Sequence, residues 1–504
     1  MAPGTQPSEC NAAPLSAQRA VASLVSGNIL VTGANLLRDI TIASILGATA
    51  IADRFFLVIS IPVFLITIAA GSFRSMSVPI LERVGQQSRE KALTLGTLLM
   101  ARGARGIVLA ALLLCAFAAV GAGLDVYFAA LFLSIVPMFA LSAYVEFSQG
   151  PLQIVDRYLV PAVLKVGLPL GMVAGLGLFA QHWDVFAASL GGFVGAGLAA
   201  VCAFILLRKS GLDRRMSPVG GTPELGWAGN NFKALIVATS ITYANPLIDQ
   251  WVGSLAGPGA VAQLGYANRV AVGIASLAAG SIAPVLLSGL SKRVGMGDHR
   301  GIRNLYLLAV SVGAWAGALA SLSFWVFGSV LVDILYVRGA FTPANGEVVT
   351  RLIALYSLQY PFYWASVAAY SYISAETLNR FLVVLGVTLF VVNLGADIAL
   401  LKAFGVYGIA LSTVIVYGVS LVIMNGFLAY KRLIALVWKD VGRVLVPVLT
   451  LVVTIAFLER NSFVGAGDNL NVGAVGAWCA FAAIAMWTVL RRYQQYRMAE
   501  ADRA

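Results

Sequence analysis

Long apolar runs separated by short polar segments dominate the chain. About fourteen such runs follow one another along the 504 residues, and each is long enough to cross a bilayer as a helix. Runs such as 107–120 and 444–457 are continuous and lack the in–out alternation of barrel strands. Because only helices or closed barrels satisfy their backbone groups in lipid, we predict an all-α polytopic membrane protein. The spans are expected near residues 18–44, 52–81, 92–122, 126–150, 158–180, 184–207, 230–255, 260–290, 303–336, 347–373, 380–402, 405–430, 442–458 and 470–490.

The charge of the loops predicts the orientation of the spans. Every second loop is basic, whereas the loops between them carry few cations. The basic loops and the tail contain Arg83, Arg89, Lys91, Arg102, Arg105, Arg157, Arg208, Lys209, Arg214, Arg215, Lys292, Arg293, Arg300, Arg303, Arg380, Lys431, Arg432, Lys439, Arg491, Arg492 and Arg497. By the positive-inside rule, both termini are expected in the cytoplasm. Residues 1–17 lack a basic n-region, so we expect no cleaved signal peptide.

Composition narrows the function classes. The chain is 60% hydrophobic and 11% charged, and its mean hydropathy is +0.87. The net charge of +12 is spread over alternate loops, so no nucleic-acid partner is expected. His182 and His299 are isolated and no Gly-rich phosphate loop is present, so we expect no zinc site, no ATP hydrolysis and no cofactor. No loop exceeds about 25 residues, which disfavours a membrane glycosyltransferase or ligase.

Weak internal similarity predicts two lobes. Residues 47–52 match residues 257–262, and Asp39 falls on Asp249 at the same displacement of 210 residues. Arg83-Val84-Gly85 recurs as Arg293-Val294-Gly295. Six spans separate equivalent points, so the lobes should share one orientation and suit alternating access. The expected parts are a tail (1–17), an N-lobe of six spans (18–209), a cytoplasmic linker (210–227), a C-lobe of six spans (228–431) and two further spans with a tail (432–504).

Ionisable residues inside the spans carry most of the functional information, because they are costly in hydrocarbon. Arg38 and Asp39 project about 100° apart on one helix, so they are expected to pair with other helices. Across a central cleft, Arg38 and Arg269 would form a cationic trap for phosphate, since the guanidinium fork binds phosphate oxygens bidentately. For Asp53, Arg54 and Glu146 the alternative is a structural salt bridge or interfacial snorkelling.

Three stretches of the sequence resemble the MurJ/MviN family of lipid II flippases, which belongs to the multidrug/oligosaccharidyl-lipid/polysaccharide exporter superfamily. The resemblance covers nearly the whole chain and includes the number of spans. The matching residues are Arg38-Asp39, Leu46-Gly47-Ala48, Ala52-Asp53, Phe55-Phe56, Pro62, Gly71, Phe73 and Val78-Pro79-Ile80-Leu81, then Tyr266-Ala267-Asn268-Arg269, Pro284 and Leu290-Ser291, and finally Gly339-Ala340-Phe341-Thr342. It implies a bacterial inner-membrane flippase whose partners are membrane lipid and a polyprenyl-diphosphate-linked glycan.

The sequence departs from this family at two places in the expected cavity. Thr32 stands where members usually carry an arginine, and Ile66-Thr67 and Ala70-Gly71-Ser72 replace an arginine and an E-G-A motif. The expected substrate-binding residues are therefore Arg38, Arg269 and Asp53, with Arg74 as a substitute cation. Peptidoglycan lipid II and a surface-polysaccharide repeat unit on the same lipid both remain open as cargo.

A second group of polar residues suggests energy coupling. Asn393 and Asp397 share one helix face at i,i+4 spacing, Thr413 lies in the next span, and Asp249 lies in the seventh. Carboxylate, amide and hydroxyl oxygens are hard ligands, so we expect a Na⁺ or H⁺ coupling site here. The alternative is a hydrogen-bonded packing network. The group also resembles a cation site in the C-lobe of the same family.

The sequence thus predicts a flippase that moves an undecaprenyl-diphosphate-linked glycan from the inner to the outer leaflet. The two additional C-terminal spans are expected to form an apolar groove for the polyprenyl tail. The alternative is a cation-coupled multidrug antiporter of the same superfamily. Such an antiporter needs an acidic cavity for a cationic drug, whereas the matched positions here are arginines.

Overall fold

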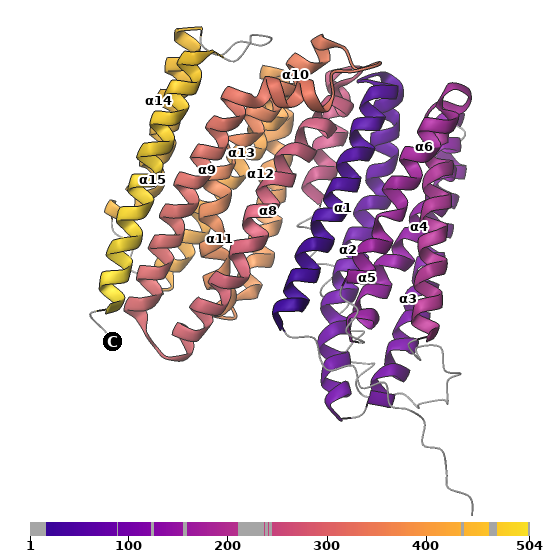
Figure 1. Cartoon of the computed structure of the whole chain (residues 1–504), viewed down its shortest axis with the longest axis horizontal. Coiled ribbons are helices and arrows are strands. Elements are labelled where there is room, and N and C mark those ends of the chain that lie inside the picture. The colour runs from indigo at the N-terminus through magenta and orange to yellow at the C-terminus, as the bar shows by residue number, and fades with distance from the viewer. Residues whose placement is uncertain are drawn as a thin grey trace, which may run out of the picture. The chain divides into compact units, whose positions relative to one another are not determined.

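The computed structural model of the chain is helical throughout its described part (Figure 1). It describes residues 17–87, 89–121, 125–154, 159–209, 236, 240, 244–434, 438–462 and 471–501. Among these residues, 14 α-helices have both ends described, and there is no strand. The helices are α1 (Ala17–Leu46), α2 (Ala50–Gln87), α3 (Arg89–Gly121), α4 (Val126–Ile154), α5 (Leu159–Lys165), α6 (Gly167–Lys209), α8 (Ala260–Gly295), α9 (His299–Leu335), α10 (Pro343–Ser357), α11 (Tyr360–Ala375), α12 (Asn379–Phe404), α13 (Val406–Tyr430), α14 (Trp438–Arg460) and α15 (Val472–Ala501).

The helices confirm the predicted all-α membrane fold. Within the described part, 10 helical stretches are long and apolar enough to cross a membrane. One of them, Leu159–Lys209, contains α5 and α6, and α6 is itself divided at Asp184, whose φ of 46° and ψ of −128° break the helical geometry. The helical residues 244–253 precede the 3-10 turn η1 (Ser254–Ala256) and fall in the predicted span 230–255. The predicted linker 210–227 lies outside the described residues.

One predicted span is interrupted. The sequence pattern predicts a single helix over 347–373, but the structure divides this stretch into α10 and α11 at Leu358 and Gln359. Pro361 explains the break, because proline has no N–H to donate to the carbonyl of Ser357. The Ser321 hydroxyl of α9 donates to that carbonyl instead, at 2.6 Å. The prediction of one uninterrupted helix is therefore wrong at this point.

The chain forms two compact units. Unit 1 consists of Met1–Arg38 and Ala69–Leu235, and unit 2 consists of Asp39–Ile68 and Ile236–Ala504. The end of α1 and the first half of α2 therefore pack with the C-terminal helices. The predicted boundaries of the two lobes stay a prediction.

Close glycine packing defines part of unit 1. The two halves of α6 run antiparallel on either side of Asp184, and glycines line their contact. A Cβ atom built on Gly191 would lie 2.1 Å from the Gly171 carbonyl oxygen, and one on Gly175 would lie 2.2 Å from the Ala187 carbonyl oxygen. The absence of side chains at these glycines lets the helix backbones touch, as is common for helices packed in lipid.

Helix α9 lies at the centre of unit 2 and packs against α8, α10, α11, α14 and α15. Buried apolar side chains of α9, α14 and α15, among them Trp315, Leu451 and Phe481, form one core cluster. A second cluster joins α8, α9, α11, α12 and α13. Figure 1 shows α14 and α15 side by side next to α9. The outer face of α14 is apolar, with Val446 and Val453 more than half exposed.

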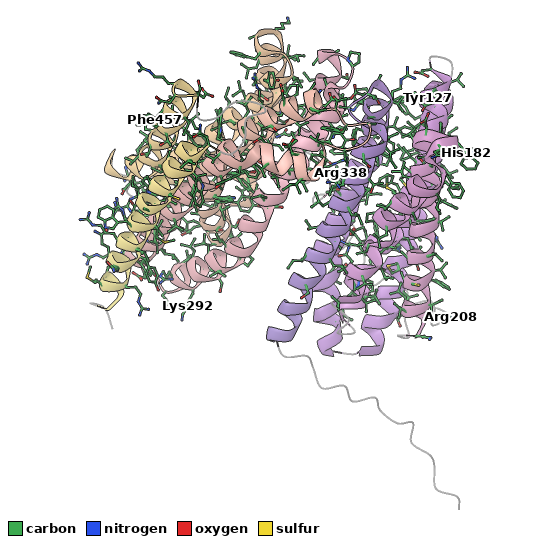
Figure 2. All side chains as sticks on the ribbon, turned by 45° about the horizontal axis from the view of Figure 1, so that its top comes forward. Tyr127, His182, Arg208, Lys292, Arg338 and Phe457 are labelled. Atoms are coloured by element: carbon green, nitrogen blue, oxygen red, sulfur yellow. The ribbon has the colours of Figure 1, made fainter. Side chains whose placement is uncertain are left out.

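The ends of each unit agree with the predicted alternation of loops. In unit 2, Lys292 lies at the opposite end from Phe457, which is close to a loop predicted to be periplasmic (Figure 2). In unit 1, Arg208 likewise lies at the opposite end from Tyr127 and His182 (Figure 2). Arg208 and Lys292 both belong to the predicted basic loops, so each unit carries one of these cations at the end that the sequence predicts to be cytoplasmic.

Candidate functional site

The two segments matched by the internal repeat have the same local form and lie together in unit 2. Each begins with a glycine at positive φ, 62° at Gly47 and 116° at Gly257, and each leads into a helix, α2 or α8. A Cβ atom on Gly259 would lie 2.7 Å from the Ala48 carbonyl oxygen, so the two turns are in direct backbone contact. This contact places the start of α2 against the start of α8.

Asp53 caps α8 from the first turn of α2. Its buried carboxylate accepts hydrogen bonds from the backbone N–H groups of Gly259 and of Ala262, the latter at 2.7 Å. The first N–H groups of a helix have no partner within the helix, and they carry the positive end of its dipole. Both oxygens of Asp53 therefore serve the packing of α2 on α8. A direct contact of Asp53 with substrate stays a prediction.

Arg269 is held by an acid and an aromatic ring. Its Nη1 atom lies 2.9 Å from an Asp39 carboxylate oxygen. The guanidinium carbon lies 4.4 Å from the centre of the Phe56 ring, which is a cation–π distance. The side chain of Arg269 remains 27% exposed, whereas that of Asp39 is 5% exposed. The expectation that Asp39 pairs with another helix is thus confirmed, and its partner is a predicted substrate-binding residue.

Buried aromatic side chains surround this ion pair. The Phe56 ring packs edge-on against Tyr266, which also contacts Tyr336 and Phe341. The Tyr266 hydroxyl donates to the Gly47 carbonyl at 3.1 Å. These rings fix the position of the helix turn that carries Arg269, so its guanidinium is oriented before any ligand binds.

Two other predicted substrate residues belong to unit 1. Arg38 immediately precedes Asp39 on α1 and is partly exposed, with interactions of its own. The side chain of Arg74 lies outside the part of the chain that the structure describes. The phosphate trap formed by Arg38 and Arg269 stays a prediction.

The predicted coupling residues Asp249, Asn393 and Asp397 lie together in unit 2. The Asn393 amide nitrogen donates to Asp249 at 2.7 Å and to Asp397 at 3.2 Å. All three side chains are at most 8% exposed. The sequence did not predict the participation of Ser412 of α13. Its hydroxyl donates to the other oxygen of Asp397.

Thr413, the fourth predicted ligand, makes a different contact. Its hydroxyl donates to the Ile409 carbonyl at 3.3 Å, and the Ser412 hydroxyl lies 2.8 Å from the same carbonyl. The i,i+4 spacing on α12 indicated that Asn393 and Asp397 share a face. For α13 the sequence offered two adjacent hydroxyls, and their orientation depends on helix rotation, which the sequence pattern does not fix.

The chemistry of this cluster fits a small hard cation. Two carboxylates are buried side by side, and no lysine or arginine of the described residues forms an ion pair with either. Buried carboxylates need a compensating cation, proton or hydrogen-bond donor. Carboxylate, amide, hydroxyl and carbonyl oxygens, all present here, are the donors that hard cations prefer.

Two further groups of ionisable residues within the helices form ion pairs. In unit 1, Lys165 lies 2.9 Å from Glu146, so the alternative of a salt bridge is confirmed for this acid. In unit 2, Asp440 at the start of α14 pairs with Arg303 of α9 at 2.7 Å and with Arg443 at 3.2 Å. This network ties α14 to α9 at the end of the unit that carries Lys292.

Comparison with known proteins identifies the family of the chain. The model of the family described as lipid II flippase MurJ matches residues 42–467. A probable lipid II flippase MurJ of Vibrio cholerae is 24% identical over 352 residues, which cover 64% of this chain and 66% of that protein. A homologue from Aquifex aeolicus with the same description is 23% identical over 399 residues, covering 75% and 77%. The match thus spans slightly less than two thirds of the Vibrio protein.

Solved structures share the fold. A lipid II flippase MurJ in an inward closed conformation superposes with a TM-score of 0.72 at 17% identity, covering 95% of this chain and 99% of that one. An inward-facing multidrug resistance transporter of the MATE family superposes with a TM-score of 0.65 at 15% identity, covering 82% and 98%. Since the family model matches well over half of the residues, this chain belongs to the MurJ family of lipid II flippases.

Proposed function

We propose that the chain is a flippase that moves a polyprenyl-diphosphate-linked glycan from the inner to the outer leaflet of a bacterial cytoplasmic membrane. It would work by alternating access, as a transporter rather than an enzyme, with both termini in the cytoplasm. Membership of the MurJ family supports this function. The structural observation that carries it is the partly exposed Arg269 guanidinium within the helical unit, held by Asp39 and Phe56.

Arg269 suits a diphosphate because of how it is held. Asp39 and Phe56 immobilise the guanidinium before any ligand arrives, so little side-chain entropy remains to be lost on binding. A guanidinium carries its N–H donors in a planar fork, and this geometry matches phosphate oxygens bidentately. Arg38 and Arg74, which belong to unit 1, stay predicted substrate-binding residues.

The polyprenyl-diphosphate-linked glycan has a polar part and an apolar part, which are stable in different environments. The diphosphate and sugars require a polar cavity, whereas the polyprenyl tail is stable in lipid. The exposed apolar face of α14 supports our proposal that α14 and α15 hold the tail. Peptidoglycan lipid II and a surface-polysaccharide repeat unit share the polyprenyl diphosphate, so both are candidate cargo.

We further propose that a small cation, Na⁺ in preference to H⁺, binds at Asp249, Asn393 and Asp397 and drives the conformational cycle. The buried carboxylate pair without an arginine or lysine partner among the described residues supports a cation there. The neutral oxygens of Asn393 and Thr413 favour a metal ion, because a proton needs only one carboxylate oxygen.

The test of cargo recognition is translocation of a labelled undecaprenyl-diphosphate glycan in proteoliposomes. Arg269→Ala and Arg269→Lys are compared at matched insertion with Arg351→Ala, an exposed arginine of α10. Loss of one charge-assisted contact costs about 1.5–3 kcal/mol, roughly a ten- to hundredfold loss of apparent affinity. We expect both Arg269 variants to lose transport and Arg351→Ala to retain most of it. Transport at the wild-type rate in Arg269→Ala would exclude the phosphate site.

Coupling is tested separately in the same vesicles with Asp397→Asn. This change keeps the size of the side chain but removes its charge, so the dependence of transport on a Na⁺ gradient should disappear while the protein remains inserted. An unchanged response to the gradient would make Asp397 a packing residue. Transport of a cationic drug instead of the glycan would favour the alternative, a multidrug antiporter.

A further inference from the structure

Ser412 of α13 lies between two hydrogen-bond acceptors but has only one proton to give. Its hydroxyl reaches the Asp397 carboxylate and also lies 2.8 Å from the Ile409 carbonyl oxygen. A serine hydroxyl carries a single O–H donor, so it can satisfy only one of these groups at a time. The side chain is 0% exposed, so water cannot replace the missing donor from bulk solvent.

The two acceptors, the Asp397 carboxylate and the Ile409 carbonyl, differ in the other hydrogen-bond donors that they contact. Asp397 also accepts from the Asn393 amide nitrogen at 3.2 Å, so both of its oxygens are engaged. The Ile409 carbonyl has a second donor in the Thr413 hydroxyl at 3.3 Å. Rotation of the Ser412 O–H from Asp397 to Ile409 would therefore free a carboxylate oxygen without leaving the hydroxyl unpaired.

We propose that Ser412 is a positioning residue of the cation site, whose O–H points to Asp397 in the ion-free protein and turns to the Ile409 carbonyl when a cation binds. This inference rests on the proposed coupling site at Asp249, Asn393 and Asp397. Ser412 thus stabilises the ion-free state by donating to a buried carboxylate, and it competes with the cation for the same oxygen. Its role is to keep the affinity low enough for the ion to be released.

The Asn393 amide supports this assignment because it also donates hydrogen bonds to the buried carboxylates. Its nitrogen donates to both carboxylates, at 2.7 Å to Asp249 and at 3.2 Å to Asp397. Amide and hydroxyl hydrogens together thus take the place of a positive charge between the two acids. Asn393 also carries an oxygen that a cation can use, whereas Ser412 has the Ile409 carbonyl as an alternative partner.

Because Ser412 and the cation compete for one oxygen of Asp397, removing the Ser412 hydroxyl should change the cation affinity in a definite direction. Ser412→Ala removes a charge-assisted hydrogen bond from the ion-free state and only a neutral one from the ion-bound state. Charged hydrogen bonds are the stronger of the two, so binding should become tighter, by roughly tenfold. A residue that ligated the cation directly would give the opposite sign, and a residue with a purely structural role would leave the affinity unchanged.

The experiment is equilibrium binding of ²²Na⁺ to the purified full-length protein in detergent. The variants are Ser412→Ala, Ser412→Thr, which keeps the hydroxyl, and Ser412→Cys, which has a weaker donor. Ser420→Ala removes a hydroxyl from another buried position of α13 and serves as the matched control. We expect Kd to fall by roughly tenfold in Ser412→Ala, less in Ser412→Cys, and to stay near the wild-type value in Ser412→Thr and Ser420→Ala.

The outcomes separate this inference from the proposal on which it rests. Saturable binding in the wild-type protein with an unchanged or higher Kd in Ser412→Ala and Ser412→Cys would overturn the role of Ser412 alone. Absence of saturable ²²Na⁺ binding in the wild-type protein would overturn the sodium site and this inference together. If Ser412→Ala does not fold, the Ser412→Cys variant still decides the sign.

Discussion

Removing the charge of Asp39 should destabilise unit 2 by breaking its ion pair with Arg269. In Asp39→Asn the guanidinium keeps its contact with Phe56, at 4.4 Å from the ring centre, but loses its anionic partner at 2.9 Å. Removing one partner of a fully buried ion pair costs about 3–5 kcal/mol, because the other charge is left uncompensated. Arg269 is 27% exposed, so solvent screens part of this cost. We therefore expect a loss of about 2–3 kcal/mol in the free energy of unfolding.

A double-mutant cycle isolates the contribution of this ion pair. Asp39→Asn, Arg269→Gln and the double variant are unfolded by titration with sodium dodecyl sulfate from mixed micelles. Since the two residues are in contact, the double variant should be about as stable as the less stable single variant, with a coupling of about 2 kcal/mol. Additive losses in the two single variants would refute the ion pair as the element that holds Arg269 in place.

Three further predictions concern topology and packing. A periplasm-active reporter fused after Gly339 should be active, and one fused near Arg214 should be inactive; the reverse would overturn the predicted orientation. Gly191→Ala should destabilise unit 1 by about 1–3 kcal/mol in the same detergent titration, because its Cβ would lie 2.1 Å from a backbone oxygen, whereas Gly177→Ala has open space and should be neutral. Ser321→Ala should cost about 1–3 kcal/mol, since it leaves the carbonyl at the break between α10 and α11 buried without its donor; a cost below about 0.5 kcal/mol would show that another group satisfies it.

Hydropathy was sufficient to predict the 10 described stretches that are long and apolar enough to cross a membrane, because each span must be apolar over its whole length in lipid. The break between α10 and α11 was not predicted, although Pro361 marked it, because a proline within a span can also produce only a kink. The sequence predicted that Asp39 has a partner on another helix, because a charged side chain is costly in hydrocarbon. It did not predict that this partner is Arg269.

Among the site residues, positions on one helix could be predicted from the sequence, whereas contacts between helices could not. The i,i+4 pair Asn393 and Asp397 could be placed on one face, because both lie on one helix. The contact of Ser412 with Asp397 was not predicted, because it depends on the rotation of α13 about its own axis. Thr413 stays a predicted ligand. The capping role of Asp53 depends on the backbone of a distant turn, and no side-chain pattern reports such a contact.

The most direct test of the proposed function is transport itself, measured with purified protein in liposomes loaded on one leaflet with a fluorescent undecaprenyl-diphosphate glycan. Accessibility of the label to a membrane-impermeant quencher reports its arrival in the other leaflet. The proposal predicts translocation that requires the wild-type protein, is abolished in Arg269→Ala, and is not inhibited by cationic drugs. Failure to move the glycan, together with proton- or sodium-driven efflux of a cationic drug from the same liposomes, would contradict it.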